Sequence, residues 1–272
     1  MSLRCVYTDL DGTMLGRGAS LLRDAEGNFS TLPIRALEAC HRAGVEVVIK
    51  SGRRKAQVYE DARLIGQQAY IYEMGCGLVD GSEEVFLTGD LEPRGGTSVY
   101  EQIERSGAAR LLLESFPGRI EYHSPWHVDR LFSHLFRGNV DIAEVETLFA
   151  EHGHDNLRLV DNGITERRSE SLVPEELHTY HLIPRAAGKA PAVALHMRRR
   201  EFDPAECIAI GDSRGDLEVA GVVGRFFLVA NALEKDPEIR TALPDSAPVT
   251  VTEEPMSAGF YEAVVRSLAE GR

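Results

Sequence analysis

The stretch VYTDLDGTML, residues 6–15, joins a short apolar strand pattern to two aspartates and a glycine. Asp9 and Asp11 are two positions apart, so their side chains would face the same way if strand geometry persisted. Two carboxylates at one strand end repel each other unless a positive group lies between them. Gly12 then offers a position at which the chain can bend. The stretch therefore predicts a strand that ends in a charged site.

The composition is that of a globular protein. The chain has 272 residues, of which 43% are hydrophobic and 27% charged, which suits one large domain or one domain with an insertion. A net charge of −13 argues against a nucleic-acid partner, because binding a phosphate backbone needs a basic surface. No apolar run approaches the roughly 20 residues of a membrane span, and no signal peptide precedes the first strand pattern. We therefore expect a cytoplasmic protein without a membrane partner.

Strand and helix patterns alternate at the beginning of the chain and again near its end. Strand patterns lie at residues 4–9, 45–52, 69–75, 207–213 and 225–231, and helix patterns at 31–44, 53–66, 188–200 and 257–272. This alternation predicts an α/β fold with a doubly wound parallel sheet. The segment GLVDGSEEVFLTG, residues 77–89, predicts a hairpin with its turn at Asp80 and Gly81.

The alternation of strand and helix patterns changes between these two parts, in residues 90–184. Helical patterns there alternate with amphipathic strand patterns at residues 130–138, 156–163 and 176–184. Such a mixture predicts a small α+β insertion with an antiparallel sheet. We therefore predict a core domain made of residues 1–89 and 185–272, and an inserted cap domain of residues 90–184.

Polar residues follow the predicted parallel strands. They are Asp9, Asp11, Ser51, Gly52, Glu73, Gly75, Asp212 and Asp216, and Lys189 opens the helix before the fourth strand. Ligands of open parallel sheets bind at the carboxyl ends of the strands, so these residues should meet. A group of carboxylates with few histidines suits Mg²⁺, and a carboxylate can also attack phosphorus. A hydroxyl and an ammonium would neutralise phosphoryl oxygens, as phosphoryl transfer requires.

These residues resemble, in order, the four motifs of the haloacid dehalogenase (HAD) superfamily. DLDGT (residues 9–13) resembles the first motif, KSGR (50–53) the second, Lys189 in AAGKAPAVAL the third and GDSRGD (211–216) the fourth. The resemblance implies a Rossmann-like core in which Asp9 is the nucleophile and Asp11 the general acid and base. It further implies phosphate binding by Ser51, Gly52 and Lys189, and Mg²⁺ binding by Asp9, Asp11 through its main-chain carbonyl, Asp212 and Asp216.

The place of the predicted cap, between the second and third motifs, resembles one branch of this superfamily. That branch includes Cof-type sugar phosphatases, sucrose-phosphate phosphatase and mannosyl-3-phosphoglycerate phosphatase. Two positions depart from its pattern, because Met74 replaces the Asn of an E-N-G segment and Gly215 replaces the Asn before Asp216. The resemblance implies a Mg²⁺-dependent phosphohydrolase that cleaves a sugar phosphate or glyceryl-sugar phosphate through an aspartyl-phosphate.

Other interpretations compete with this one. The same core could serve a sugar phosphomutase, or a catalytically silent domain that binds a phosphorylated metabolite. Ser51 by itself is more typical of a helix N-cap. GDSRG, residues 211–215, matches a nucleophile elbow, but no histidine follows Ser213 to complete a triad.

The predicted cap contains further candidates whose role the pattern leaves open. Trp126 and the histidines of EYHSPWHVDR could line a substrate pocket or belong to a packed loop. Arg130, Arg137, Arg158 and Arg167 are equally ambiguous. The pattern predicts neither the natural substrate nor an oligomeric state.

Overall fold

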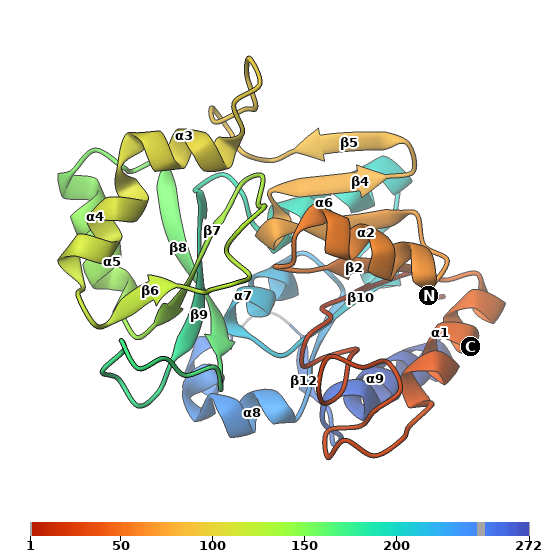
Figure 1. The fold of residues 1–272 in the computed structure, drawn as a ribbon. Coiled ribbons are helices and arrows are strands. Elements are labelled where there is room, and N and C mark those ends of the chain that lie inside the picture. Colours follow the sequence, from red (N-terminus) through yellow and green to blue (C-terminus); the bar gives the residue numbers. More distant parts are fainter. Residues whose placement is uncertain (1, 244–247, 272) are drawn as a thin grey trace.

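The computed structural model describes residues 2–243 and 248–271, and its largest element is a sheet at the centre right of Figure 1. Within those residues this sheet has eight strands in the order β12-β11-β10-β1-β2-β3-β4-β5. They are β1 (Cys5–Thr8), β2 (Glu46–Lys50), β3 (Ala69–Tyr72), β4 (Gly77–Asp80), β5 (Glu83–Phe86), β10 (Cys207–Gly211), β11 (Arg225–Leu228) and β12 (Val249–Val251). The strands from β12 to β3 run parallel, and β4 and β5 form an antiparallel edge. The predicted α/β class and parallel sheet are confirmed.

Helices cover both faces of this sheet because successive strand side chains point to opposite sides. Val6 belongs to the same hydrophobic cluster as Ala36 and Phe260, whereas the next residue, Tyr7, belongs to a second cluster that contains Val193. The helices of the first face are α1 (Leu32–Ala43), α2 (Lys55–Leu64) and α9 (Met256–Glu270), and α6 (Lys189–Arg200) covers the second. Two shorter helices, α7 (Arg214–Leu217) and α8 (Asn231–Lys235), follow β10 and β11.

The second sheet lies at the left of Figure 1, between the large sheet and the helices α4 and α5. It is antiparallel, with the order β6-β7-β9-β8. Its elements are β6 (Ile120–Tyr122), β7 (His134–Gly138), β8 (Leu157–Ile164) and β9 (His178–Pro184), with α3 (Val99–Ser106), α4 (Ala108–Ser115) and α5 (Ile142–Glu151). The antiparallel sheet expected in this part of the chain is present.

Several predicted elements end elsewhere. β1 ends at Thr8, because Leu10 turns into the core and its carbonyl accepts hydrogen bonds from the amides of Thr13 and Leu15. The predicted strand 69–75 stops at Tyr72, since the backbone of Glu73–Gly75 has positive φ angles and forms a 3-10 turn.

Other differences are smaller. The hairpin turn falls one position later than expected, at residues 81–82, because Asp80 pairs with Glu83. The pattern did not predict α4, β6 or β12. The helix predicted at 257–272 is α9, and position 272 lies outside the described residues. No helix in the described part of the chain is both long and apolar enough to cross a membrane.

Candidate active site

The carboxyl ends of three neighbouring strands bring predicted site residues together. β1 lies between β10 and β2 and is parallel to both, so Asp9, Ser51 and Asp212 leave the sheet at adjacent strand ends. Lys189 arrives as the first residue of α6. Gly75 allows this approach, because a Cβ there would lie 2.0 Å from the carbonyl oxygen of Gly188.

Two buried lysines and one buried aspartate form the centre of the site. Lys189 Nζ lies 3.1 Å from Asp9 Oδ1 and 2.8 Å from Asp216 Oδ1. Lys50 Nζ donates to the same Asp216 oxygen at 2.5 Å, and Ser213 Oγ donates to the other at 2.7 Å. Burial would raise the pKa of Asp216, but the ammonium groups of Lys189 and Lys50 outweigh it and hold that pKa below its ordinary value. Asp216 is therefore a fixed carboxylate that orients Lys189.

Lys50 forms a buried ion pair in the site. This role was not predicted from the sequence, because Lys50 was treated only as part of the KSGR motif. Its side chain is fully buried, and it also donates to the carbonyl of Ile210 at 3.1 Å. A usable signal was present, because Lys50 ends an otherwise apolar strand directly before Ser51. A buried ammonium requires a counter-charge, and Asp216 supplies it.

Three carboxylates converge beside this centre. Asp9, Asp212 and Asp216 each present an oxygen within 4.8 Å of the others. Burial raises the pKa of Asp9 to about 7; Lys189 opposes this rise, whereas the charge of Asp216 adds to it. Negative charge is thus only partly compensated at Asp9. An oxygen-only donor set of this kind fits a hard divalent cation.

Gly12 makes room for one of these carboxylates. Its φ is +79°, and a Cβ built on it would lie 2.2 Å from Asp212 Oδ2. Asp212 is also held by Lys235 Nζ at 3.1 Å and by the Thr13 hydroxyl at 3.4 Å. The glycine of DLDGT therefore permits both the turn of the chain and the close approach of the fourth motif.

Asp11 is not part of the group of three carboxylates, because it pairs with Arg53. Its two oxygens accept from Arg53 Nε at 2.7 Å and Arg53 Nη2 at 2.6 Å, and its side chain is 53% exposed. Because β1 ends at Thr8, the strand alternation that would align Asp11 with Asp9 does not extend to it. The proton-carrying and metal-binding roles of Asp11 stay predictions.

Ser51 and Gly52 follow β2, beside the segment that leads into β7 of the second sheet. Ser51 is buried, and its hydroxyl accepts from the amide of Arg53 at 3.2 Å. It is not the N-cap of α2, which begins at Lys55 after Arg54. The Gly52 carbonyl accepts from Arg130 Nη1 at 3.0 Å.

Glu73 forms a second connection between the two sheets. Its fully buried carboxylate accepts from the amides of Leu131, Phe132 and Ser133 at 2.9, 3.0 and 2.9 Å, and from the Ser133 hydroxyl at 2.9 Å. Four charge-assisted hydrogen bonds thus fix the segment that precedes β7. The E-N-G resemblance marked this position, but its role required the structure.

Comparison with known proteins supports the resemblance that the four motifs indicate. No family model matches the chain. HMP-PP phosphatase from Klebsiella pneumoniae (strain 342) is 30% identical over 260 residues, covering 87% of this chain and 86% of that protein. A haloacid dehalogenase-like hydrolase from B. subtilis shares the fold with a TM-score of 0.60 and 16% identity, covering 97% of this chain and 99% of the other. The chain belongs to the haloacid dehalogenase superfamily.

Further relatives place this HAD protein among phosphatases. Phosphoglycolate phosphatase from Methanoculleus marisnigri is 26% identical over 272 residues, covering 96% of this chain and 95% of that protein. The sucrose-phosphatase of Synechocystis sp. PCC6803, solved with sucrose and phosphate, has a TM-score of 0.67 at 14% identity and covers 98% of each chain. The predicted HAD-type phosphatase is confirmed.

The two departures from the HAD branch pattern contact each other. A Cβ built at Gly52 would lie 3.1 Å from Met74 Sδ, and one built at Gly215 would lie 3.1 Å from Met74 Cε. Met74 therefore extends from the second motif to the fourth, and the absence of a side chain at Gly215 leaves space for its methyl group. The structure accounts for Met74 and Gly215 as one packing arrangement.

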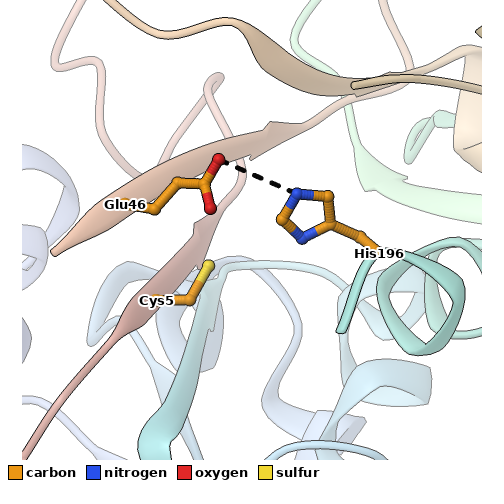
Figure 2. A group of neighbouring side chains, drawn as sticks. All are labelled: Cys5, Glu46 and His196. Carbon is orange, nitrogen blue, oxygen red and sulfur yellow. Dashed lines mark ion pairs between the residues drawn. The ribbon is translucent and has the colours of Figure 1, made fainter. Parts of the chain in front are cut away.

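A second group of potential ligands lies at the opposite edge of this HAD core, at the amino ends of β1 and β2. Figure 2 shows it as Cys5, Glu46 and His196, with His196 Nε2 3.8 Å from Glu46 Oε1. Glu46 also accepts from Arg200 at 3.0 Å, and His196 Nδ1 lies 2.8 Å from the Tyr7 hydroxyl. Burial raises the pKa of the Cys5 thiol well above its ordinary value. We assign this group to packing and ion pairing.

Proposed function

We propose that this HAD phosphatase hydrolyses a small phosphoric monoester with Mg²⁺, through an aspartyl-phosphate on Asp9. The observation that carries the proposal is the buried Asp9 carboxylate, which lies 3.1 Å from Lys189 Nζ and beside the carboxylates of Asp212 and Asp216. The names of its relatives, phosphoglycolate phosphatase and HMP-PP phosphatase, support a small phosphorylated substrate. A sugar phosphate or glyceryl-sugar phosphate stays a prediction.

The first half of the reaction transfers the phosphoryl group to the protein. An Asp9 oxygen attacks phosphorus, the bond from phosphorus to the ester oxygen breaks, and Asp11 gives that oxygen a proton. Asp11 must release Arg53 to do so, and its exposed position allows this movement. Lys189 and Ser51 neutralise and orient the phosphoryl oxygens, where charge accumulates in the transition state.

The second half returns the site to its starting state. Water gives a proton to Asp11 and attacks phosphorus, and the bond to Asp9 breaks to release phosphate. Asp216 keeps Lys189 in place throughout, because both are buried and paired. When bound, Mg²⁺ would be held by Asp9, Asp212 and the main-chain carbonyl of Asp11, with Asp216 supporting, and would supply positive charge to the phosphoryl oxygens.

We further propose that residues 90–184 act as the cap of this site. The hydrogen bonds of Glu73 and of the Gly52 carbonyl support this proposal, because they anchor residues 130–133 directly beside the second motif. A cap in this place would exclude water from the phosphoryl group and contact the leaving group.

Hydrolysis of p-nitrophenyl phosphate and of a panel of metabolite phosphates tests the function. We expect phosphate release with Mg²⁺ and its loss with EDTA. Asp9→Asn should lower kcat by at least about 1000-fold because the nucleophile is removed. Asp90→Asn, at an exposed position after β5, is the matched control and should retain full activity.

The outcomes separate the alternatives. Asp9→Asn activity equal to that of the unmodified protein would overturn the proposed mechanism. Transfer of the phosphoryl group back to a hexose 1-phosphate, without release of phosphate, would identify a phosphomutase. Thermal stabilisation by phosphorylated metabolites without turnover would identify a silent binding domain.

A further inference from the structure

One row of side chains crosses three strands of the second sheet and reaches the residue that follows β6. Leu135 of β7 pairs with His181 of β9, and His181 pairs with Val160 of β8. His123 joins the row after β6, because its amide donates to the Leu135 carbonyl at 3.0 Å. Directly paired residues of an antiparallel sheet present their side chains on the same face. His123, Leu135, His181 and Val160 therefore share one face.

This face is turned toward the second and fourth motifs. A Cβ built at Gly52 would lie 2.8 Å from His181 Nε2, and one built at Gly215 would lie 3.6 Å from Val160 Cγ1. Met74 contacts both glycines and lies under the same face. The row therefore forms one wall beside the phosphate-binding residues, and that wall is apolar except at its two histidines.

The two histidines carry unused hydrogen-bonding capacity. His181 is 2% exposed and His123 is 6% exposed, and the Nδ1 atom of each is buried without a partner among the described residues. Burial lowers the pKa of His181 well below its ordinary value, and the charges of Arg130 and Lys189 lower it further. Burial also lowers the pKa of His123 to about 4. Both rings are therefore neutral at pH 7.

A neutral imidazole has one N–H donor and one lone pair. A buried orphan lone pair is less costly than a buried orphan N–H, so the proton belongs on Nε2 of each ring and Nδ1 carries the lone pair. His181 Nε2 is also the atom that lies closest to the position of a Gly52 side chain. His181 thus offers an N–H donor beside the second motif, and His123 lies in the same row of the wall.

Basic side chains lie near these donors, although Lys189 is itself paired with Asp9 and Asp216. Arg130 is 8% exposed and lies close enough to lower the pKa of both histidines, and Lys189 acts on His181 in the same way. Arg137 also acts on His123, although Glu121 neutralises part of its charge through a contact of 2.7 Å. An anionic oxygen would satisfy both the donors and this charge.

We propose that His181 and His123 form the leaving-group subsite of this phosphatase, and that the subsite accepts the carboxylate of a small phosphorylated hydroxy acid. This inference rests on the proposed function, because the wall adjoins the phosphate-binding residues. The subsite would favour an acidic over a neutral leaving group, because a carboxylate accepts from an imidazole N–H and is attracted by the basic side chains around it, whereas a neutral group gains neither interaction. Trp126, by contrast, packs under the Arg167 guanidinium at 3.8 Å and belongs to the loop.

Phosphoglycolate and ethyl phosphate provide the test, because both have two carbons but only the first has a carboxylate. We expect kcat/KM for phosphoglycolate to exceed that for ethyl phosphate by about 100-fold. His181→Phe should lower the value for phosphoglycolate about 10- to 100-fold and leave ethyl phosphate and p-nitrophenyl phosphate within about threefold. His181→Gln keeps a donor near the Nε2 position and should restore most of the lost preference.

Several results would overturn the inference. They are equal losses on acid and neutral substrates, no preference for phosphoglycolate, or His181→Gln behaving as His181→Phe. If His181→Phe does not fold, as judged by circular dichroism, His123→Leu replaces it with the same expected loss of preference. Failure of the proposed function looks different, because p-nitrophenyl phosphate would then not be hydrolysed by the unmodified protein in an Asp9-dependent way.

Discussion

At the scale of single residues, the two aspartates of the DLDGT segment have different partners, and Gly12 makes this possible. Asp9 stays in the buried group with Lys189, whereas Asp11 turns outward to Arg53. Gly12 lies between this outward turn and the Asp212 carboxylate, with no space for a side chain. The electrostatic conflict expected of two adjacent aspartates is thus relieved partly by separation and partly by a different cation for each.

Gly12→Ala should therefore lower both stability and activity. The positive φ costs an alanine about 1 kcal/mol, and the Cβ would displace Asp212, so we expect a loss of about 100-fold in kcat/KM. Gly18→Ala is the matched control, since its φ of +73° is similar but nothing lies within 4 Å of its Cβ. Urea unfolding and phosphate release measure the two effects. Equal activity losses in both variants would contradict the role assigned to Gly12.

At the scale of elements, the turn after β3 carries the connection between the sheets. Glu73 and Met74 have backbone φ angles of 45° and 58°, which residues other than glycine rarely adopt. This backbone aims Glu73 at three consecutive amides of the segment before β7 and leaves Met74 between two motif glycines. The strained turn is held by the contacts it makes possible.

Glu73→Gln should weaken this connection. Glu73 Oε2 accepts from the amides of Phe132 and Ser133 and from the Ser133 hydroxyl, and Oε1 accepts from the amide of Leu131. A glutamine could keep its oxygen in the Oε2 place, but its NH₂ would then oppose the N–H of Leu131, and the negative charge would be lost. We expect a loss of about 3 kcal/mol in the free energy of unfolding. Glu114→Gln, at an exposed position on α4, should change it by less than about 0.5 kcal/mol. Urea titration decides; an unchanged stability of Glu73→Gln would show that the connection is weak.

At the scale of the whole molecule, buried histidines link stability to pH. His196 is fully buried, and this burial lowers its pKa to about 4; Asp80 opposes the shift, and the charges of Arg200 and Arg199 reinforce it. In the unfolded chain its pKa is about 6.5. Between these values only the unfolded chain binds the proton, so stability is fully present above pH 6.5 and is lost as the pH falls to 4.

Replacing His196 should remove this part of the pH dependence. The free energy of unfolding of the unmodified protein, minus that of His196→Gln, should decrease by roughly 3 kcal/mol between pH 6.5 and pH 4. Carboxylate titrations are common to both proteins and cancel in the difference. His41→Gln, at an exposed position on α1, should show no such decrease. A constant difference for His196→Gln in urea unfolding would show that the fold does not lower the pKa of His196.

The sequence alone determined the parallel sheet and the chemical nature of its edge. Strand and helix periods are local properties, and parallel strands necessarily place Asp9, Ser51 and Asp212 at one edge. The four ordered motifs were therefore sufficient to predict a HAD phosphatase. Lys50 was within reach of the same reasoning, because a lysine in an apolar strand needs a buried partner.

Only the tertiary structure decided which side chains meet across that edge. The direction of Asp11, the contact of Met74 with Gly215 and the row that brings His181 to Gly52 all join segments distant in sequence. No periodic pattern encodes such contacts, because they depend on where a turn ends a strand and on how two sheets are packed together. The phosphate chemistry can thus be read from the motifs, whereas the residues that the second sheet places beside them depend on packing between the sheets.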